Sequence, residues 1–323
     1  MIHSVVRLSG QLSTIDGLPP AEHDAEVLWL EANAPTAAEA AALRERFGIG
    51  THPQGGNVLE EGEFLYLRSQ LIALGANGEP SFASVTFVLG DRIVATLTND
   101  PDFRPFGTVL QRCKRRPSNT ESPKALLRLL LQTANDRAAD VIDYVADTLV
   151  QTTGQISEIS DGYDERGREL GVSDLSAAMR GLNDTEELIL RCVEAQLTLE
   201  RSIRYLSDEV DNRTEQDLQV LVNELAGDVA GTKEHAKFQH ERVRYLQTAV
   251  TNILNIKQNE IIKVFTIVTA VFLPPTLIGT LYGMNFAVMP ELSWEHGFIY
   301  SMCLTLGAAL LPLWYIKRRG WLR

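Results

Sequence analysis

The sequence predicts an α/β cytosolic domain, a long helical stalk and two C-terminal transmembrane helices. Two apolar runs near the C-terminus, Ile261–Leu281 and Gly297–Ile316, carry this prediction. Each is about twenty residues, long enough as a helix to cross the roughly 30 Å hydrocarbon core of a bilayer. Strand-like segments also give way to helical ones near Ser122. The expected segments are the α/β domain (1–121), a cytosolic helical region (122–213), the stalk (214–260), the first span (261–281), an external loop (282–296), the second span (297–316) and a basic cytosolic tail (317–323).

The α/β domain is expected to begin with a strand over Val27–Leu30. A helix should follow, because Thr36 suits an N-cap and Glu39 stands three residues later, as in a capping box. Gly48 is the expected end of this helix. A strand followed by a capped helix is typical of an α/β unit.

Further strands are predicted later in the same domain. Phe64–Leu74 alternates in part between apolar and polar residues. Phe82–Leu89 and Arg92–Leu97 flank Gly90-Asp91, which predicts a hairpin. The Gly-rich stretch His52–Gly56 lacks the Lys-Ser/Thr of a phosphate-binding loop, so we expect an ordinary loop there.

The helical region is expected to start at Ser122, with Pro123 in the first turn, and to run without strong breakers to Gly154. Further helical stretches are predicted over Leu175–Leu182 and Asp184–Val210. Thr214–Ile262 then continues into the first span without a proline, which predicts a rod of about 100 Å to Thr280. Near-heptad apolar positions favour a stalk that couples the cytosol to the membrane, or a coiled-coil spacer. They are Leu218, Leu221, Val222, Leu225, Val229, Leu246, Val250, Ile253 and Ile256.

The basic residues predict the orientation in the membrane. Lys317, Arg318 and Arg319 follow the second span, whereas the linker between the spans has neither Lys nor Arg. Basic residues favour the cytoplasmic side, so both termini are expected in the cytoplasm, with the protein in the inner (plasma) membrane. The opening of the chain has no long apolar stretch, so we expect no signal peptide. Three scattered cysteines fit a reducing compartment.

The charge of the cytosolic part limits its partners. The chain has 30 basic and 42 acidic residues. Five of the basic and two of the acidic residues follow Ile261, so the cytosolic part has 25 basic and 40 acidic residues. Such an acidic body argues against nucleic acid and against anionic lipid as its partners and is compatible with cations. We find no nucleophile, metal-ligand set or phosphate loop in residues 1–260 and expect no enzyme. His235 and His240 are five residues apart on the stalk, and we expect both to be solvated.

One face of the first span is expected to carry hydroxyl groups at steps of three or four residues. Such a face is suited to water or to other helices rather than to lipid. A single stripe cannot enclose a pore but several copies around an axis can, which favours a homo-oligomer. The alternative is that each threonine only bonds back to its own helix. The face comprises Thr266, Thr269, Leu273, Thr276 and Thr280, with Ile262 extending it toward the cytosol.

This face lacks Asp, Glu, His and Cys, which limits the ions that it can handle. Zinc held directly prefers Cys and His, whereas Mg²⁺ gives up its water reluctantly and is often bound through it. A tube of hydroxyls, carbonyls and an amide therefore suits a hydrated hard cation. In the external loop, Glu291 and Glu295 are expected to attract cations, while Gly283 and Pro290 let the chain turn and expose Asn285.

A distinctive set of motifs lies around the loop. Tyr282-Gly283-Met284-Asn285 directly follows a span containing Pro and Thr, and Met289-Pro290-Glu291-Leu292, a second apolar span and a basic end come after it. This arrangement resembles the CorA family of Mg²⁺/Co²⁺ channels. The close resemblance covers roughly Asn259–Arg323, and the rest agrees in outline.

The resemblance implies a funnel-shaped homopentamer that conducts Mg²⁺, Co²⁺ and possibly Ni²⁺, with no cofactor other than transported and regulatory divalent cations. Gly283, Met284 and Asn285 would form the selectivity filter, and the hydroxyl face would line the pore. Lys317, Arg318 and Arg319 would ring the cytosolic mouth. The family also binds Mg²⁺ between cytosolic domains to close the channel, for which Glu224 and Asp228 are our candidates. Leu273, where the family often has Met, is a candidate hydrophobic gate.

Two alternatives stay open at this point. The zinc-transporting ZntB branch shares the fold but usually lacks Met-Pro-Glu-Leu. A membrane-anchored scaffold or sensor would also have a two-span hairpin. It would need neither the threonine face nor a charge-poor loop bearing Asn285.

Overall fold

Seven strands form one sheet in the order β2-β1-β3-β7-β6-β5-β4 in the computed structural model of the chain. The structure describes residues 1–8, 11–51, 56–162, 166, 170–211, 213–285 and 289–319, without the side chains of Glu291 and Leu292. Strands β3 and β7 pair in parallel and the other pairs are antiparallel. The strands are β1 (Ile2–Leu8), β2 (Gln11–Asp16), β3 (Val27–Asn33), β4 (Val58–Glu61), β5 (Phe64–Leu74), β6 (Pro80–Leu89) and β7 (Val94–Thr98).

The predicted strand and helix at the start of the domain are confirmed. After β3, helix α1 (Ala37–Phe47) begins with a capping box in which Glu39 N donates to Thr36 Oγ1 over 3.3 Å. The Glu39 carboxylate accepts in turn from Thr36 N over 2.8 Å. Gly48 ends the helix with φ +73°, a conformation that favours glycine.

The predicted hairpin is confirmed as β6 and β7, and Phe64–Leu74 is strand β5. Gly90 lies in the turn, where an added Cβ would come 2.5 Å from the Phe64 ring. Strands β1, β2 and β4 were not predicted. Of the Gly-rich stretch His52–Gly56, only Gly56 lies within the described residues.

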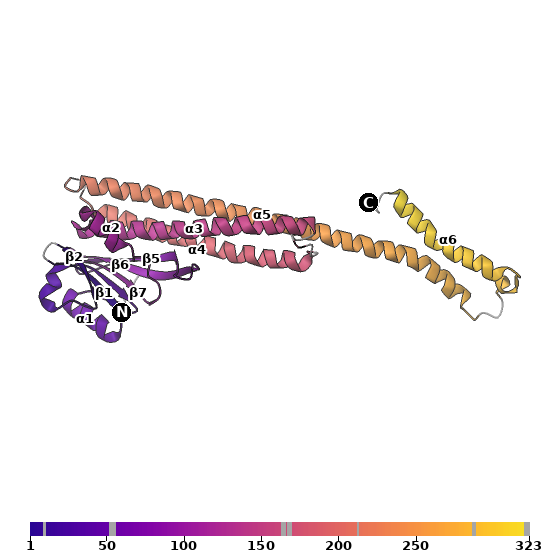
Figure 1. Cartoon of the computed structure of the whole chain (residues 1–323), viewed down its shortest axis with the longest axis horizontal. Coiled ribbons are helices and arrows are strands. Elements are labelled where there is room, and N and C mark those ends of the chain that lie inside the picture. Colours follow the sequence, from indigo (N-terminus) through magenta and orange to yellow (C-terminus); the bar gives the residue numbers. More distant parts are fainter. Residues whose placement is uncertain are drawn as a thin grey trace.

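Three long helices, α3 (Pro123–Asp161), α4 (Val172–Glu209) and α5 (Gln216–Tyr282), run side by side beyond the sheet (Figure 1). Helix α3 begins at Pro123, as predicted, with Ser122 as its N-cap, but it continues through Gly154 to Asp161. The two helical stretches predicted before the stalk are a single helix, α4. The remaining helical elements are η1 (Ala21–Glu26), α2 (Val109–Arg115), η2 (Pro117–Thr120), η3 (Pro290–Ser293) and α6 (Gly297–Arg318).

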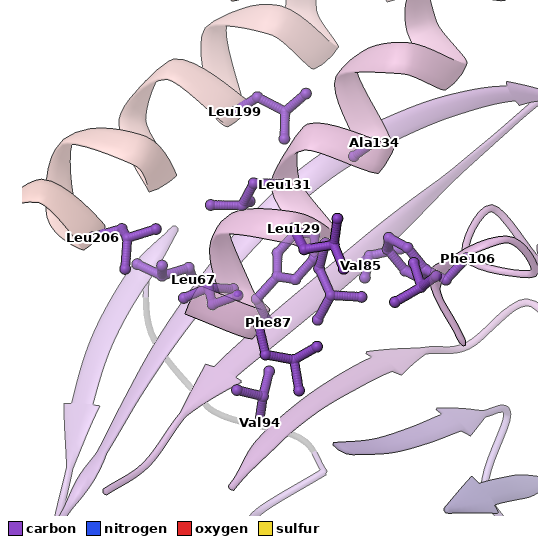
Figure 2. Close-up of a cluster of buried hydrophobic side chains, with 14 of the residues drawn as sticks. Leu67, Val85, Phe87, Val94, Phe106, Leu129, Leu131, Ala134, Leu199 and Leu206 are labelled. Atoms are coloured by element: carbon purple, nitrogen blue, oxygen red, sulfur yellow. The ribbon is translucent and has the colours of Figure 1, made fainter. Parts of the chain in front are cut away.

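The main core lies between the sheet and helices α3 and α4 (Figure 2). Phe87 of β6 is fully buried, and its ring meets that of Phe106 edge-on with centroids 5.9 Å apart. Leu129 of α3 and Leu199 of α4 belong to the same cluster. This packing joins the sheet to the base of the helical bundle.

The first half of α5 packs against α3 and α4 of its own chain. Val222 and Val229 join the main core, and Val243 and Val250 join a second cluster higher in the bundle. The near-heptad pattern therefore encodes a three-helix bundle within one chain, which replaces the coiled-coil interpretation. Phe238 on the outer side of α5 is 61% exposed.

Beyond the bundle α5 continues without α3 and α4, and α6 then folds back beside its end (Figure 1). Both α5 and α6 contain stretches long and apolar enough to cross a membrane. The C-terminal end of α6 returns toward the bundle (Figure 1). The structure thus places the two predicted spans in a helical hairpin at one end of the molecule.

Candidate ion pathway

The threonine face of α5 is left uncovered by α6. Ile267, Pro274 and Ile278 are half-buried on the side of α5 that α6 contacts. The threonine face lies roughly a third of a turn away from that side, by the 100° step of an α-helix. Its six residues, Ile262, Thr266, Thr269, Leu273, Thr276 and Thr280, are all exposed.

Each threonine of this face bonds back to its own helix. Thr266 Oγ1 donates to the Ile262 carbonyl over 2.8 Å, and Thr269 Oγ1 to the Phe265 carbonyl over 2.8 Å. Thr276 and Thr280 do the same over 2.7 Å and 2.8 Å. A hydroxyl that donates its proton keeps two acceptor lone pairs. The face therefore presents oxygen acceptors outward, as a hydrated cation requires.

Two shallow grooves follow this face and meet at Leu273. The groove nearer the C-terminal end of α5 includes Thr276 and Thr280, and the groove nearer the bundle includes Ile262 and Thr266. Thr269 and Leu273 line both grooves, and Leu273 is 60% exposed. A bulky apolar side chain thus interrupts a row of hydroxyls halfway along the span.

The Gly-Met-Asn motif caps the outer end of the same helix. Gly283 N donates to the Gly279 carbonyl over 3.0 Å, and Met284 N to the Leu281 carbonyl over 3.3 Å. Asn285 follows, exposed, just beyond the last turn. Gly283 has φ −87° and ψ 0°, which any residue adopts, so the backbone here does not require glycine's conformational freedom.

The acids of the external loop are described in part. The backbone of Glu291 lies in η3, and its side chain is outside the described residues. Glu295 is exposed just before α6. Near it, the Trp294 and Tyr300 rings meet edge-on with centroids 5.8 Å apart.

The candidate regulatory acids Glu224 and Asp228 are both exposed on α5. Burial and the neighbouring Arg116 lower the pKa of Arg128, whereas Glu224 acts in the opposite direction, so Glu224 lies in the field of that guanidinium. The described residues contain no group of three or more His, Cys, Asp or Glu side chains able to hold a metal.

The stalk histidines differ from the prediction in one respect. His240 is half-buried, and its Nε2 lies 3.1 Å from Glu186 Oε1 on α4. Hydrogen bonds from Gln247 and His240 lower the pKa of Glu186. His235 is exposed, as expected. These residues join α4 to α5 and do not form a metal site.

The basic residues at the end of α6 point in different directions. Lys317 and Arg318 lie in the last turn, and Arg319 follows. Arg318 comes two residues after the buried Ile316, which places it on the side of α6 opposite Ile316. Lys317, Arg318 and Arg319 were predicted to act as one cluster, although the 100° step of an α-helix already separates the directions of their side chains.

Comparison with known proteins decides the family. The model of the CorA-like Mg²⁺ transporter protein matches residues 24–318. The chain belongs to this family. As a CorA-like Mg²⁺ transporter it is not an enzyme, as predicted, and its fold class is confirmed by solved CorA structures.

Several CorA relatives match over nearly the whole chain. The magnesium transport protein CorA of Pasteurella multocida is 28% identical over 333 residues, covering 100% of each chain. That of Haemophilus ducreyi is 27% identical over 311 residues, covering 95% of this chain and 91% of the relative.

Solved structures show the same fold. CorA from Methanocaldococcus jannaschii superposes with a TM-score of 0.74 at 17% identity, over 99% of both chains. The cytoplasmic domain of ZntB from Vibrio parahaemolyticus superposes with a TM-score of 0.51 at 10% identity, over 80% of this chain and 98% of that domain. The CorA-like architecture therefore extends from the sheet through both spans.

Proposed function

We propose that several copies of this chain form a pore that conducts hydrated Mg²⁺ across the inner membrane, each α5 lining it with its threonine face. The observation that carries the proposal is the continuity of this uncovered face with Asn285 at the outer end of the same helix. A pentamer, as implied by the family resemblance, would place five such faces around one axis. Both termini would lie in the cytoplasm.

Asn285 would select the ion at the outer entrance. An amide oxygen accepts a hydrogen bond from a metal's water without holding the ion as a carboxylate would, so a ring of them can position and release it. An inward membrane potential favours entry by about 4.6 kcal/mol per 100 mV for a divalent ion. Co²⁺ and Ni²⁺, which also carry hydration shells, are the further ions proposed to pass.

The proposed function is tested with purified protein in liposomes that contain a Mg²⁺-sensitive dye. We expect Mg²⁺ influx that depends on the protein and increases with an inside-negative potential. The same vesicles loaded with a zinc indicator test the ZntB alternative. Zinc influx without Mg²⁺ influx would favour it, and influx of neither ion would favour a scaffold or sensor.

Glu291 is expected to raise the local cation concentration at the entrance. We expect Glu291→Gln to reduce Mg²⁺ influx moderately at low ionic strength and to have little effect at high salt, because salt screens exposed charges. Glu295→Gln should behave in the same way. Influx is measured over a series of salt concentrations, and a reduction that is equal at every concentration would contradict the electrostatic role.

Glu224 and Asp228 are proposed to take part in inhibition by cytosolic Mg²⁺. Acids from neighbouring copies would repel one another, and a bound Mg²⁺ would favour the closed arrangement by relieving that repulsion. Neutralising both should raise the Mg²⁺ concentration needed for inhibition. Glu241→Gln, an exposed change elsewhere on α5, is the control. An unaltered inhibition curve would remove the pair from the regulatory site.

A further inference from the structure

The cytosolic end of α6 carries an arrangement of cations and aromatic rings that the pore does not use. The Arg318 guanidinium lies 5.3 Å from the centre of the Trp314 ring, and that of Arg319 lies 5.5 Å from the Tyr315 ring. Arg319 Nε also donates to the Tyr315 hydroxyl over 3.3 Å. Each arginine is thus held beside a ring one turn earlier on the helix.

Trp314 and Arg318 face away from α5. Ile316 between them is only 7% exposed, and α5 is the neighbouring helix that contacts α6. Trp314 precedes Ile316 by two residues and Arg318 follows it by two, so both lie on the opposite side of the helix. Trp314 is 58% exposed there, beside the exposed Leu310 and Leu311. The pair therefore faces the surroundings of the hairpin, which in a membrane are lipid.

The depth of this group matches the edge of a bilayer. Gly297 and Arg318, the two ends of α6, are twenty-one residues apart, which is about 32 Å along the axis and close to the roughly 30 Å hydrocarbon core. Tryptophan and tyrosine gather where the hydrocarbon meets the headgroups, at both ends of a span. Trp314 would thus lie at the inner interface, with Arg318 one turn farther out, at the level of the lipid phosphates.

Within the part of the chain that the structure describes, no carboxylate pairs with the cations of this group. Among the ion pairs of the described residues, none involves Lys317, Arg318 or Arg319. The chain as a whole has a net charge of −12, so acids are plentiful elsewhere. A guanidinium stacked on a ring keeps its N–H groups available to phosphate oxygens. The unpaired cations are therefore suited to an anionic ligand at the membrane surface.

We propose that Trp314, Arg318 and Arg319 bind the headgroup of an anionic phospholipid in the cytoplasmic leaflet. The lipid's phosphate would meet the two guanidinium groups, and its glycerol and upper acyl chain would lie against Trp314 and the leucines before it. This assigns Arg318 and Arg319 to the lipid headgroup and leaves Lys317 as the candidate for the cytosolic mouth. The proposal depends on the proposed topology only for the choice of leaflet.

The test measures which lipids stay with the full-length protein. The protein is reconstituted in phosphatidylcholine containing some phosphatidylglycerol and extracted in mild detergent, and the retained lipids are identified by mass spectrometry. We expect enrichment of phosphatidylglycerol. The double change Arg318→Gln with Arg319→Gln should reduce this enrichment by about fivefold for each arginine that contacts the headgroup, the value expected for one basic residue near an anionic surface.

A matched control separates this site from net charge. Arg180→Gln with Arg201→Gln removes two exposed arginines of α4, far from α6 in the chain, and should leave the enrichment unchanged. Arg318→Lys with Arg319→Lys keeps the charges and should retain most of the enrichment, even if the glutamine variant assembles poorly. Equal loss in the α4 control, or full enrichment in the glutamine variant, would overturn the proposal. So would displacement of the lipid by inorganic phosphate.

The readout is independent of ion conduction. Lipid enrichment in a protein that conducts no ion would support this site while contradicting the proposed function. Normal Mg²⁺ influx with no lipid preference would contradict this site while supporting the proposed function.

Discussion

Asn285→Ala is expected to abolish Mg²⁺ influx, or nearly so, while the protein still reaches the membrane and assembles. Asn285 is exposed three residues beyond the end of α5 at Tyr282, and alanine has no oxygen to accept a hydrogen bond from the ion's water. The change leaves the helix end intact, because the backbone bonds of Gly283 and Met284 do not involve this side chain. Influx into liposomes measures the effect.

Asn252→Ala is the matched control for this experiment. Asn252 is also exposed on α5, but it lies before the membrane span. We expect the Mg²⁺ influx of the Asn252→Ala protein to equal that of the unaltered protein. Size-exclusion chromatography of both variants verifies assembly. Normal influx by an assembled Asn285→Ala protein would refute the selectivity role.

Leu273→Ser is expected to raise the basal flux of Mg²⁺ and to weaken closure by cytosolic Mg²⁺. Leu273 is the bulky apolar residue at which the two grooves of the threonine face meet. A narrow apolar ring can block ions by dewetting, and a hydroxyl at that position would keep it wet. The flux is measured in liposomes over a range of internal Mg²⁺ concentrations.

Leu310→Ser is the control for the gate. Leu310 is similarly exposed, but it lies on α6, outside the threonine face. Leu310→Ser makes the same chemical change at a position expected to contact lipid, so the basal Mg²⁺ flux of this variant should stay low. An unchanged basal flux in an assembled Leu273→Ser protein would count against the gate.

Strong local signals made part of the fold predictable. The capping box of Thr36 and Glu39 indicates the start of a helix, and Gly48 indicates its end. Both occur as predicted. The spans were equally clear, since apolar runs of about twenty residues with at most one charge are rarely anything but membrane spans. Gly154 is a weak signal by comparison. It interrupts α3 in sequence but costs only about 1 kcal/mol relative to alanine, which the packing of a long helix offsets.

Other features depended on contacts that no local pattern contains. The apolar positions of the stalk have the same spacing whether their partners are in another chain or in α3 and α4, and the structure selects the latter. The short strands β1, β2 and β4 are held by pairing with distant neighbours. In the candidate site, the helical period predicted the threonine face. No pattern in the sequence predicted that α6 would lie beside α5 and leave this face uncovered.

Because α5 is one continuous helix, the direction of the threonine face relative to the bundle depends on the number of residues between them. From its packing in the bundle to its last turn at Tyr282 the helix has no interruption other than Pro274 and Pro275. One residue inserted between the bundle and the span would turn the threonine face by about 100° relative to the cytosolic domain, whereas seven would turn it by only about 20°. We therefore expect insertions of seven residues in this segment to be tolerated better than insertions of one, although the segment lies outside the threonine face.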